Sequence, residues 1–203
     1  MQDLDHIQVD ERARNLKRFE IKGNYHLKSI CLSNLDLVAF TCKGFHIDLD
    51  LAHLSKLKEL ELDISFLSFN DVFNQISACA LSLQYLSISV DEPEDFSLLE
   101  YVPKLPNLKK LRLAVGGNGD DCLLFLASVL NACPNLETFS ITPRWISPII
   151  RRKKARDATN PHKHLKLVEI EEYKGYCMKK EAVLSRAKLI ESIMPKGVDL
   201  VIV

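Results

Sequence analysis

The 203-residue chain has no net charge and no long apolar run. Its 27 Lys and Arg residues balance its 27 Asp and Glu residues, so charge gives no argument for a nucleic acid, a membrane or another strongly charged partner. No apolar run approaches the roughly 18 residues of a transmembrane helix, so we expect no membrane span. The charged start MQDLDHIQVDERARNLK lacks the apolar core of a signal peptide. We therefore expect the protein in the cytoplasm, the nucleus or both.

Cysteine pairs of the C-x-x-C type are also missing. The six cysteines stand singly along the chain: Cys31, Cys42, Cys79, Cys122, Cys133 and Cys177. Most of them adjoin apolar residues. In a chain without a signal peptide they are interpreted as buried thiols in a reducing compartment, and we expect no disulfides.

The sequence contains no recognisable catalytic constellation. Its histidines are scattered, and no serine- or cysteine-centred elbow motif occurs. Glu59, Glu61 and Asp63 could be considered an acid–base set, but their alternation is that of one strand face, which favours a partner-contacting or solvated strip. The chain is therefore expected not to be an enzyme. A small-molecule receptor with a pocket beside the sheet is a weaker alternative.

Two stretches that suggest a cofactor or metal site fail on spacing. His162, His164 and Cys177 supply three donors, whereas structural zinc needs four at recognisable intervals. The glycine-rich stretch AVGGNGDD at 114–121 lacks both the G-K-S/T ending of a P-loop and the G-x-G-x-x-G pattern. Its glycines suit a strand-to-helix turn. We predict no metal and no cofactor.

What the chain has is a repeat. The pattern L-x-x-L-x-L, with Phe, Val, Ile or Cys at the later positions, recurs seven times, in NLKRFEI, NLDLVAFTC, SKLKELEL, LSLQYLSI, LPNLKKLRL, CPNLETFSI and HKHLKLVEI. The first leucines are Leu16, Leu37, Leu57, Leu83, Leu108, Leu136 and Leu165, at spacings of 21, 20, 26, 25, 28 and 29 residues. These spacings match the leucine-rich repeat period of roughly 20–29 residues.

The predicted fold is an α/β leucine-rich-repeat solenoid with a parallel concave sheet. The first two returning segments, HLKSICLS and FHIDLDL, alternate like strands. Later ones have helical spacing, at 70–79 with Asn70 as N-cap and at 120–133 behind Asp120. The convex side should therefore change from extended to helical. A last helix at 178–193 and a strand at 197–203 should close the array.

Three regions organise the chain. Residues 1–14 form a polar N-terminal segment, residues 15–160 hold the repeats with a basic loop at 144–163, and residues 161–203 hold the last repeat with a C-terminal cap. Trp145 is expected to anchor the loop. The basic cluster of this loop is Arg151, Arg152, Lys153, Lys154 and Arg156. A solvated loop, a nuclear-import signal and a phosphate-binding patch all remain open for it.

The outward-facing strand positions are the candidate partner-binding residues, because a solenoid presents an extended concave sheet. Their charges alternate in local patches, which suits a protein partner better than a nucleic acid. The candidate set is Glu20, Lys22, Thr41, Lys43, Glu59, Glu61, Asp63, Tyr85, Ser87, Lys110, Arg112, Ser140, Glu169 and Glu171.

The phrases NLKRFEIKG, NLDLVAFTCKG and CPNLETFSI, and above all HKHLKLVEIEEYKGYC with EAVLSRAKLIESI, resemble the repeats and FBD-type C-terminal segment of plant F-box/LRR proteins. The resemblance covers nearly the whole chain and implies that the repeats recognise the substrate of a cullin ubiquitin ligase. In that family an upstream F-box binds a Skp-type adaptor. Nothing before Leu16 resembles an F-box, and the sole tryptophan is Trp145. The alternatives are thus a fragment, a truncated product, or a scaffold or decoy receptor without ligase attachment.

Overall fold

A computed structural model of the chain describes residues 5–24, 26–45, 47–51, 53–65, 68–94, 101–117, 121–143, 163–171 and 198–202. Its main feature is an eight-stranded, all-parallel sheet in the order β11-β10-β9-β8-β7-β6-β4-β2. The strands are β2 (Arg18–Asn24), β4 (Ala39–Phe45), β6 (Glu59–Ser65), β7 (Tyr85–Glu94), β8 (Lys110–Gly117), β9 (Thr138–Pro143), β10 (Leu167–Ile170) and β11 (Asp199–Ile202). Each repeat adds one strand, so the α/β leucine-rich-repeat solenoid is confirmed, as is the closing strand.

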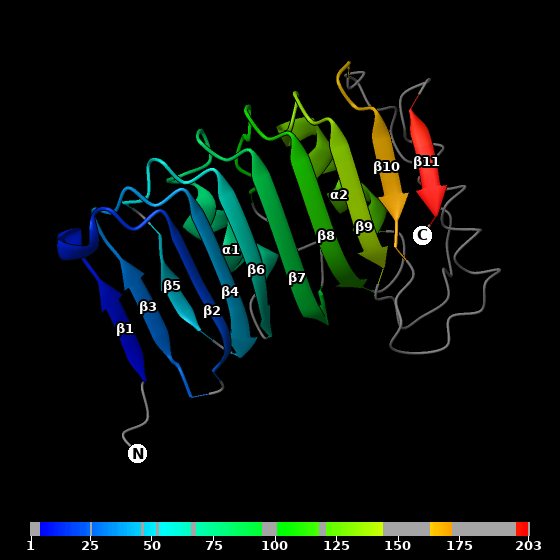
Figure 1. The fold of residues 1–203 in the computed structure, drawn as a ribbon. Coiled ribbons are helices and arrows are strands. Elements are labelled where there is room, and N and C mark those ends of the chain that lie inside the picture. Colours follow the sequence, from blue (N-terminus) through cyan, green and yellow to red (C-terminus); the bar gives the residue numbers. More distant parts are fainter. Residues whose placement is uncertain are drawn as a thin grey trace.

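The opposite side of the solenoid changes character along the chain, as predicted (Figure 1). At the N-terminal end it is a three-stranded parallel sheet, β1-β3-β5, made of β1 (His6–Val9), β3 (Ser29–Leu32) and β5 (Asp48–Asp50). Further on it is helical, with α1 (Phe69–Ile76) and α2 (Asp121–Ala132). The repeat lengths explain the change, since a whole repeat of 20 or 21 residues leaves a returning segment too short for a full helix.

β1 and the short 3-10 helix η1 (Glu11–Ala13) lie in the segment for which only polarity was predicted. β1 pairs with β3 in register, with Ile7 opposite Ile30 and Val9 opposite Leu32. Ile7 and Val9 are partly buried against the core. The N-terminal segment is therefore an additional extended return of the solenoid.

One hydrophobic core runs between the two layers. The first leucine of each repeat from Leu37 to Leu136 is fully buried, Leu165 nearly so, and only Leu16, in the first repeat, is partly buried. Strand side chains alternate between faces, so β6 buries Leu60, Leu62 and Ile64 while its other residues face outward. Burying each leucine or isoleucine contributes about 1.5–3 kcal/mol.

The N-cap of the first helix differs from the prediction. Ser68, two residues before the expected Asn70, caps α1 in a reciprocal capping box with Asp71. The Asp71 amide donates to Ser68 Oγ at 3.1 Å, and the Ser68 amide donates to Asp71 Oδ2 at 3.3 Å. Two otherwise unpaired amides are satisfied at once, which explains why the helix begins earlier. The predicted cap at Asp120 lies outside the described residues.

The helical part of the convex side is joined by aromatic packing. Phe69 and Phe73 of α1 meet Phe125 of α2, with ring centroids 4.7 Å and 6.3 Å from that of Phe125. All three rings are buried. Side chains from two different repeats thus fix how the helices sit on the sheet.

Several predicted features lie outside the described residues. They are Trp145 with the basic cluster 151–156, His162, Cys177 and the final helix at 178–193. Cys42, Cys79 and Cys133 are buried as expected, while Cys31 is half-buried on β3.

Candidate protein-binding surface

The concave face is the face of the eight-stranded sheet that points away from the core. Strand register arranges its side chains in three rows that cross the sheet. The first row is Arg18, Ala39, Glu59, Tyr85, Lys110, Thr138 and Leu167; the second is Glu20, Thr41, Glu61, Ser87, Arg112, Ser140 and Glu169; the third is Lys22, Lys43, Asp63, Ser89, Ala114 and Thr142. Glu171 follows Thr142 at the end of the third row, and the two side chains are hydrogen-bonded. All fourteen candidate residues therefore share this face, and their role in binding stays a prediction.

The N-terminal half of the concave face carries paired charges. Arg18 Nη2 donates to Glu59 Oε2 at 3.0 Å, reaching over the small Ala39 on the strand between them. Lys43 Nζ lies 2.6 Å from Glu61 Oε1 on the next strand. The hydrogen bond to Glu61 raises the pKa of Lys43. These pairs fix the orientation of long side chains that would otherwise move freely.

Glu20 and Lys22 form an ion pair along β2 itself. The hydrogen bond from Lys22 lowers the pKa of the Glu20 carboxyl, so it is ionised at neutral pH. Both side chains remain substantially exposed, which keeps the energetic value of the pair small.

The C-terminal half holds a denser polar network. Arg112 Nη2 on β8 lies 2.5 Å from Glu171 Oε2, crossing over β9. Thr142 Oγ1 donates to the same carboxylate oxygen at 3.0 Å. Ser140 Oγ donates to Glu169 Oε2 at 2.7 Å. The hydroxyls of β9 therefore support both acidic side chains, and Arg112 neutralises one of them.

Small side chains separate the two halves. Ser87, Ser89 and Ala114 are neighbours on β7 and β8. Ser87 and Ser140 are each only 8% exposed, although both were predicted to face solvent. These two serines therefore offer little area for direct contact with a partner. Ser89 Oγ is buried and has no hydrogen-bond partner among the described side chains.

Thr142 was missed by sequence reasoning. It stands two residues after Ser140, so strand alternation places it on the same face, and that signal could have found it. Its contact with Glu171 makes it part of the concave network.

The described part of the chain offers no metal site and no membrane span. Over those residues no group of three or more His, Cys, Asp or Glu side chains could hold a metal ion. No described helix has the length and apolar character needed to cross a bilayer. His164 is exposed, directly before the buried Leu165, where the repeat pattern places a polar residue.

Comparison with known families agrees with the fold. Residues 2–194 match the family described as the At1g61320/AtMIF1, LRR domain. The chain belongs to that family. It is thus a leucine-rich-repeat domain of a plant protein type, a fold whose concave sheet serves protein interaction. The match assigns neither an F-box nor an FBD segment. No curated protein matches the chain, and no solved structure does.

Proposed function

We propose that the concave face of this LRR domain binds a protein partner. The observation that carries the proposal is the set of three rows aligned by strand register, in which ion pairs lie on both sides of the small residues Ser87, Ser89 and Ala114. Such a surface offers positioned charges of both signs with small side chains between them, which suits a polypeptide partner. A uniformly charged ligand would meet repulsion in either half.

The Arg112–Glu171 pair is the point at which to test the concave face. Arg112→Glu places two carboxylates together and should lower partner affinity by about tenfold or more, as expected for a centrally placed charge. The Arg112 side chain is 51% exposed and that of Glu171 26%, so loss of the pair should change the free energy of unfolding by about 1 kcal/mol. The measurement is the Kd of a partner identified by pull-down, with thermal unfolding in parallel.

Two matched variants control this experiment. Asp48→Lys changes an exposed charge on β5, on the opposite side of the solenoid, and should leave affinity unchanged. The double variant Arg112→Glu with Glu171→Arg keeps the ion pair but reverses its direction, and should bind as weakly as the single variant. Equal affinity for Arg112→Glu and the unaltered chain would contradict concave binding.

We further propose that the partner is a substrate delivered to a cullin ubiquitin ligase. The support is the resemblance of the repeats and of the HKHLKLVEIEEYKGYC segment to plant F-box/LRR proteins. The Skp-type adaptor and cullin would then attach through an F-box upstream of the repeats. A scaffold or decoy receptor with the same concave face but no ligase attachment is the alternative.

A pull-down from plant extract with the proteasome inhibited tests the ligase assignment. Recovery of a Skp-type adaptor and cullin with the chain would show that these residues contain a docking element and would support the assignment. Recovery of a distinct partner without adaptor or cullin would support a scaffold, or a recognition module that these residues do not themselves attach to the ligase.

The cellular location is proposed to be the cytoplasm, the nucleus or both. The basic cluster 151–156 is the candidate nuclear-import signal. Replacing its five basic residues by alanine in a fluorescent fusion should move the protein out of the nucleus. An unchanged nuclear fraction of the fusion protein would show that the basic cluster is not a nuclear-import signal.

A further inference from the structure

Lysines stand at regular intervals along the edge of the solenoid where the concave strands begin. The residue directly before each concave strand forms a row held by backbone hydrogen bonds of 2.8–2.9 Å between successive repeats. From β2 to β10 this row reads Lys17, Val38, Lys58, Gln84, Lys109, Glu137 and Lys166. A lysine therefore directly precedes every second strand, and all four lysine side chains are exposed. We call these four lysines, with Arg14 and Lys56 beside them, the basic edge.

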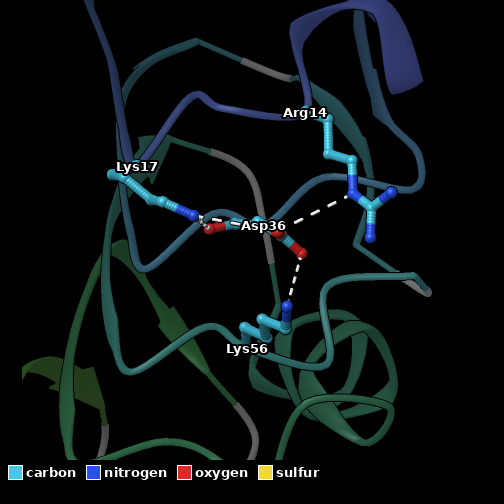
Figure 2. Close-up of polar contacts among 4 residues, drawn as sticks. All are labelled: Arg14, Lys17, Asp36 and Lys56. Atoms are coloured by element: carbon cyan, nitrogen blue, oxygen red, sulfur yellow. Dashed lines mark hydrogen bonds and ion pairs between the residues drawn. The ribbon is translucent and has the colours of Figure 1, made fainter.

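One end of the basic edge is organised by a single carboxylate. Asp36, in the loop before β4, accepts a hydrogen bond from Lys56 Nζ at 2.7 Å and lies 3.8 Å from both Arg14 Nε and Lys17 Nζ (Figure 2). The three cations come from the loops before β2 and β6. Their side chains are 71%, 60% and 59% exposed for Arg14, Lys17 and Lys56. Three positive charges thus share one negative charge and still face solvent.

The other end repeats this arrangement. Glu137 lies between two lysines of the row, with Lys166 Nζ at 2.9 Å from Oε2 and Lys109 Nζ at 3.4 Å from Oε1. The lysine side chains are 74% and 60% exposed. Between the two ends, Lys58 makes no ion pair with any described residue. The edge therefore holds positioned cations in excess over the anions that position them.

The backbone spacing of the lysines matches the repeat of one extended polypeptide conformation. Neighbouring strands lie about 4.8 Å apart, so the backbones of lysines on every second strand lie about 9.6 Å apart, and their flexible side chains can reach ligand groups near that spacing. A polyproline II helix rises about 3.1 Å per residue with three residues per turn, so every third side chain recurs on one face at about 9.3 Å. From Lys17 to Lys166 the row spans about 29 Å, and ten residues of polyproline II place four such side chains over about 28 Å.

We propose that the basic edge binds an extended acidic polypeptide segment with a carboxylate at every third residue. A polypeptide fits better than a polyphosphate surface, because Asp36 and Glu137 lie within the edge and would repel closely spaced phosphates. Leu81, three residues before Gln84 in the loop that leads into β7, is 71% exposed. Its carbonyl oxygen accepts a hydrogen bond from Asn107 Nδ2 at 2.7 Å, which holds this loop against the next. An apolar contact is thus available beside the charges.

The test uses two synthetic peptides of identical composition. One is five repeats of Glu-Pro-Pro, and the other is five glutamates followed by ten prolines. Fluorescence anisotropy at low and moderate salt gives the affinity of each. The spaced peptide should bind at least about tenfold more tightly than the block peptide, and added salt should weaken it.

Two double variants of the full chain complete the test. Lys58→Glu with Lys109→Glu should reduce affinity for the spaced peptide at least about tenfold. Lys28→Glu with Lys104→Glu makes the same change in net charge at two exposed lysines outside the basic edge and should bind as the unaltered chain does. Circular dichroism confirms that both are folded.

Equal affinity for the two peptides would overturn the proposal, since it would reveal attraction by bulk charge alone. Equal losses in the two double variants would overturn it for the same reason. Tighter binding to single-stranded RNA or phosphatidylserine vesicles than to the spaced peptide would also contradict it. Arg112→Glu should leave peptide binding unchanged, so failure here is distinguishable from failure of the concave-face proposal.

Discussion

The two carboxylates of the basic edge, Asp36 and Glu137, should make its stability depend on pH, because lysines lower the pKa of each. The hydrogen bond from Lys56 lowers the pKa of Asp36, and that from Lys166 lowers the pKa of Glu137. A carboxyl whose pKa is lower in the folded state contributes stability above its unfolded pKa, and this is lost as pH falls through the folded value. The ion pairs of Asp36 and Glu137 should therefore stabilise the fold throughout the neutral pH range and be lost only below about pH 4.

Asp36→Asn tests this dependence. The variant should be slightly less stable than the unaltered chain at pH 7, and the difference should shrink as the pH falls below about 4, because Asp36 is then protonated in both states. Urea unfolding at a series of pH values measures it. A difference that stays constant down to the lowest pH at which the chain is folded would show that Asp36 acts through packing and not through its charge.

The buried cysteine thiols should react slowly with alkylating reagents. Burial raises the pKa of Cys42 and Cys133 to about 12 and that of Cys79 to about 11. Because the thiolate is the reactive form, these three should stay unlabelled by iodoacetamide at pH 8 while the chain is folded. Cys31, half-buried, should react before them, although desolvation and the nearby Asp50 raise its pKa too. Peptide mapping by mass spectrometry reads each site, and rapid labelling of Cys42 would contradict the core assignment.

At the scale of elements, the cap of α1 can be isolated. Ser68→Ala removes the side-chain half of the capping box and should lower the free energy of unfolding by about 1 kcal/mol. Ser55→Ala changes an exposed serine that has no hydrogen bond to a described residue, and should have almost no effect. Urea denaturation of both variants measures the difference. Equal stabilities would mean that Asp71 alone suffices at this helix terminus.

The elements show what sequence patterns can and cannot predict. Seven leucine positions predicted seven concave strands, because each strand has two or more inward apolar residues in a fixed relation to its leucine. β1 was missed since only Ile7 and Val9 carry its signal. Asn70 was predicted as the N-cap of α1, but Ser68 is an equally suitable residue type, and only the backbone decides which one precedes the helix.

The sequence predicted which residues lie on the concave face, but not which of them form ion pairs with one another. Strand alternation placed the outward residues on one face without knowledge of neighbouring strands. The Arg18–Glu59 and Arg112–Glu171 pairs each cross an intervening strand, so they depend on register over three repeats and on small residues between them. The ion pairs around Asp36 likewise join residues up to 22 positions apart in sequence. Composition and spacing contain no such information.

At the scale of the molecule, stability depends on contacts between neighbouring repeats. Leu111 of β8 is 2% exposed and lies opposite Leu86 of β7 and Phe139 of β9. Leu111→Ala should cost about 2–5 kcal/mol and increase hydrogen exchange in both adjacent strands, because a solenoid couples each repeat to its neighbours. Exchange that increased only within β8, or unchanged stability, would contradict this coupling.

The central claim is that the concave face receives the protein partner, and lysine footprinting tests it most directly. The chain is acetylated under native conditions with and without the partner, and each lysine is quantified by mass spectrometry. We predict that Lys43 and Lys110 are protected in the complex while Lys28, beside Asp5 at the start of β3, is acetylated equally in both samples. Protection of Lys28 with full acetylation of Lys43 and Lys110 would place the partner on the other side of the solenoid and contradict the claim.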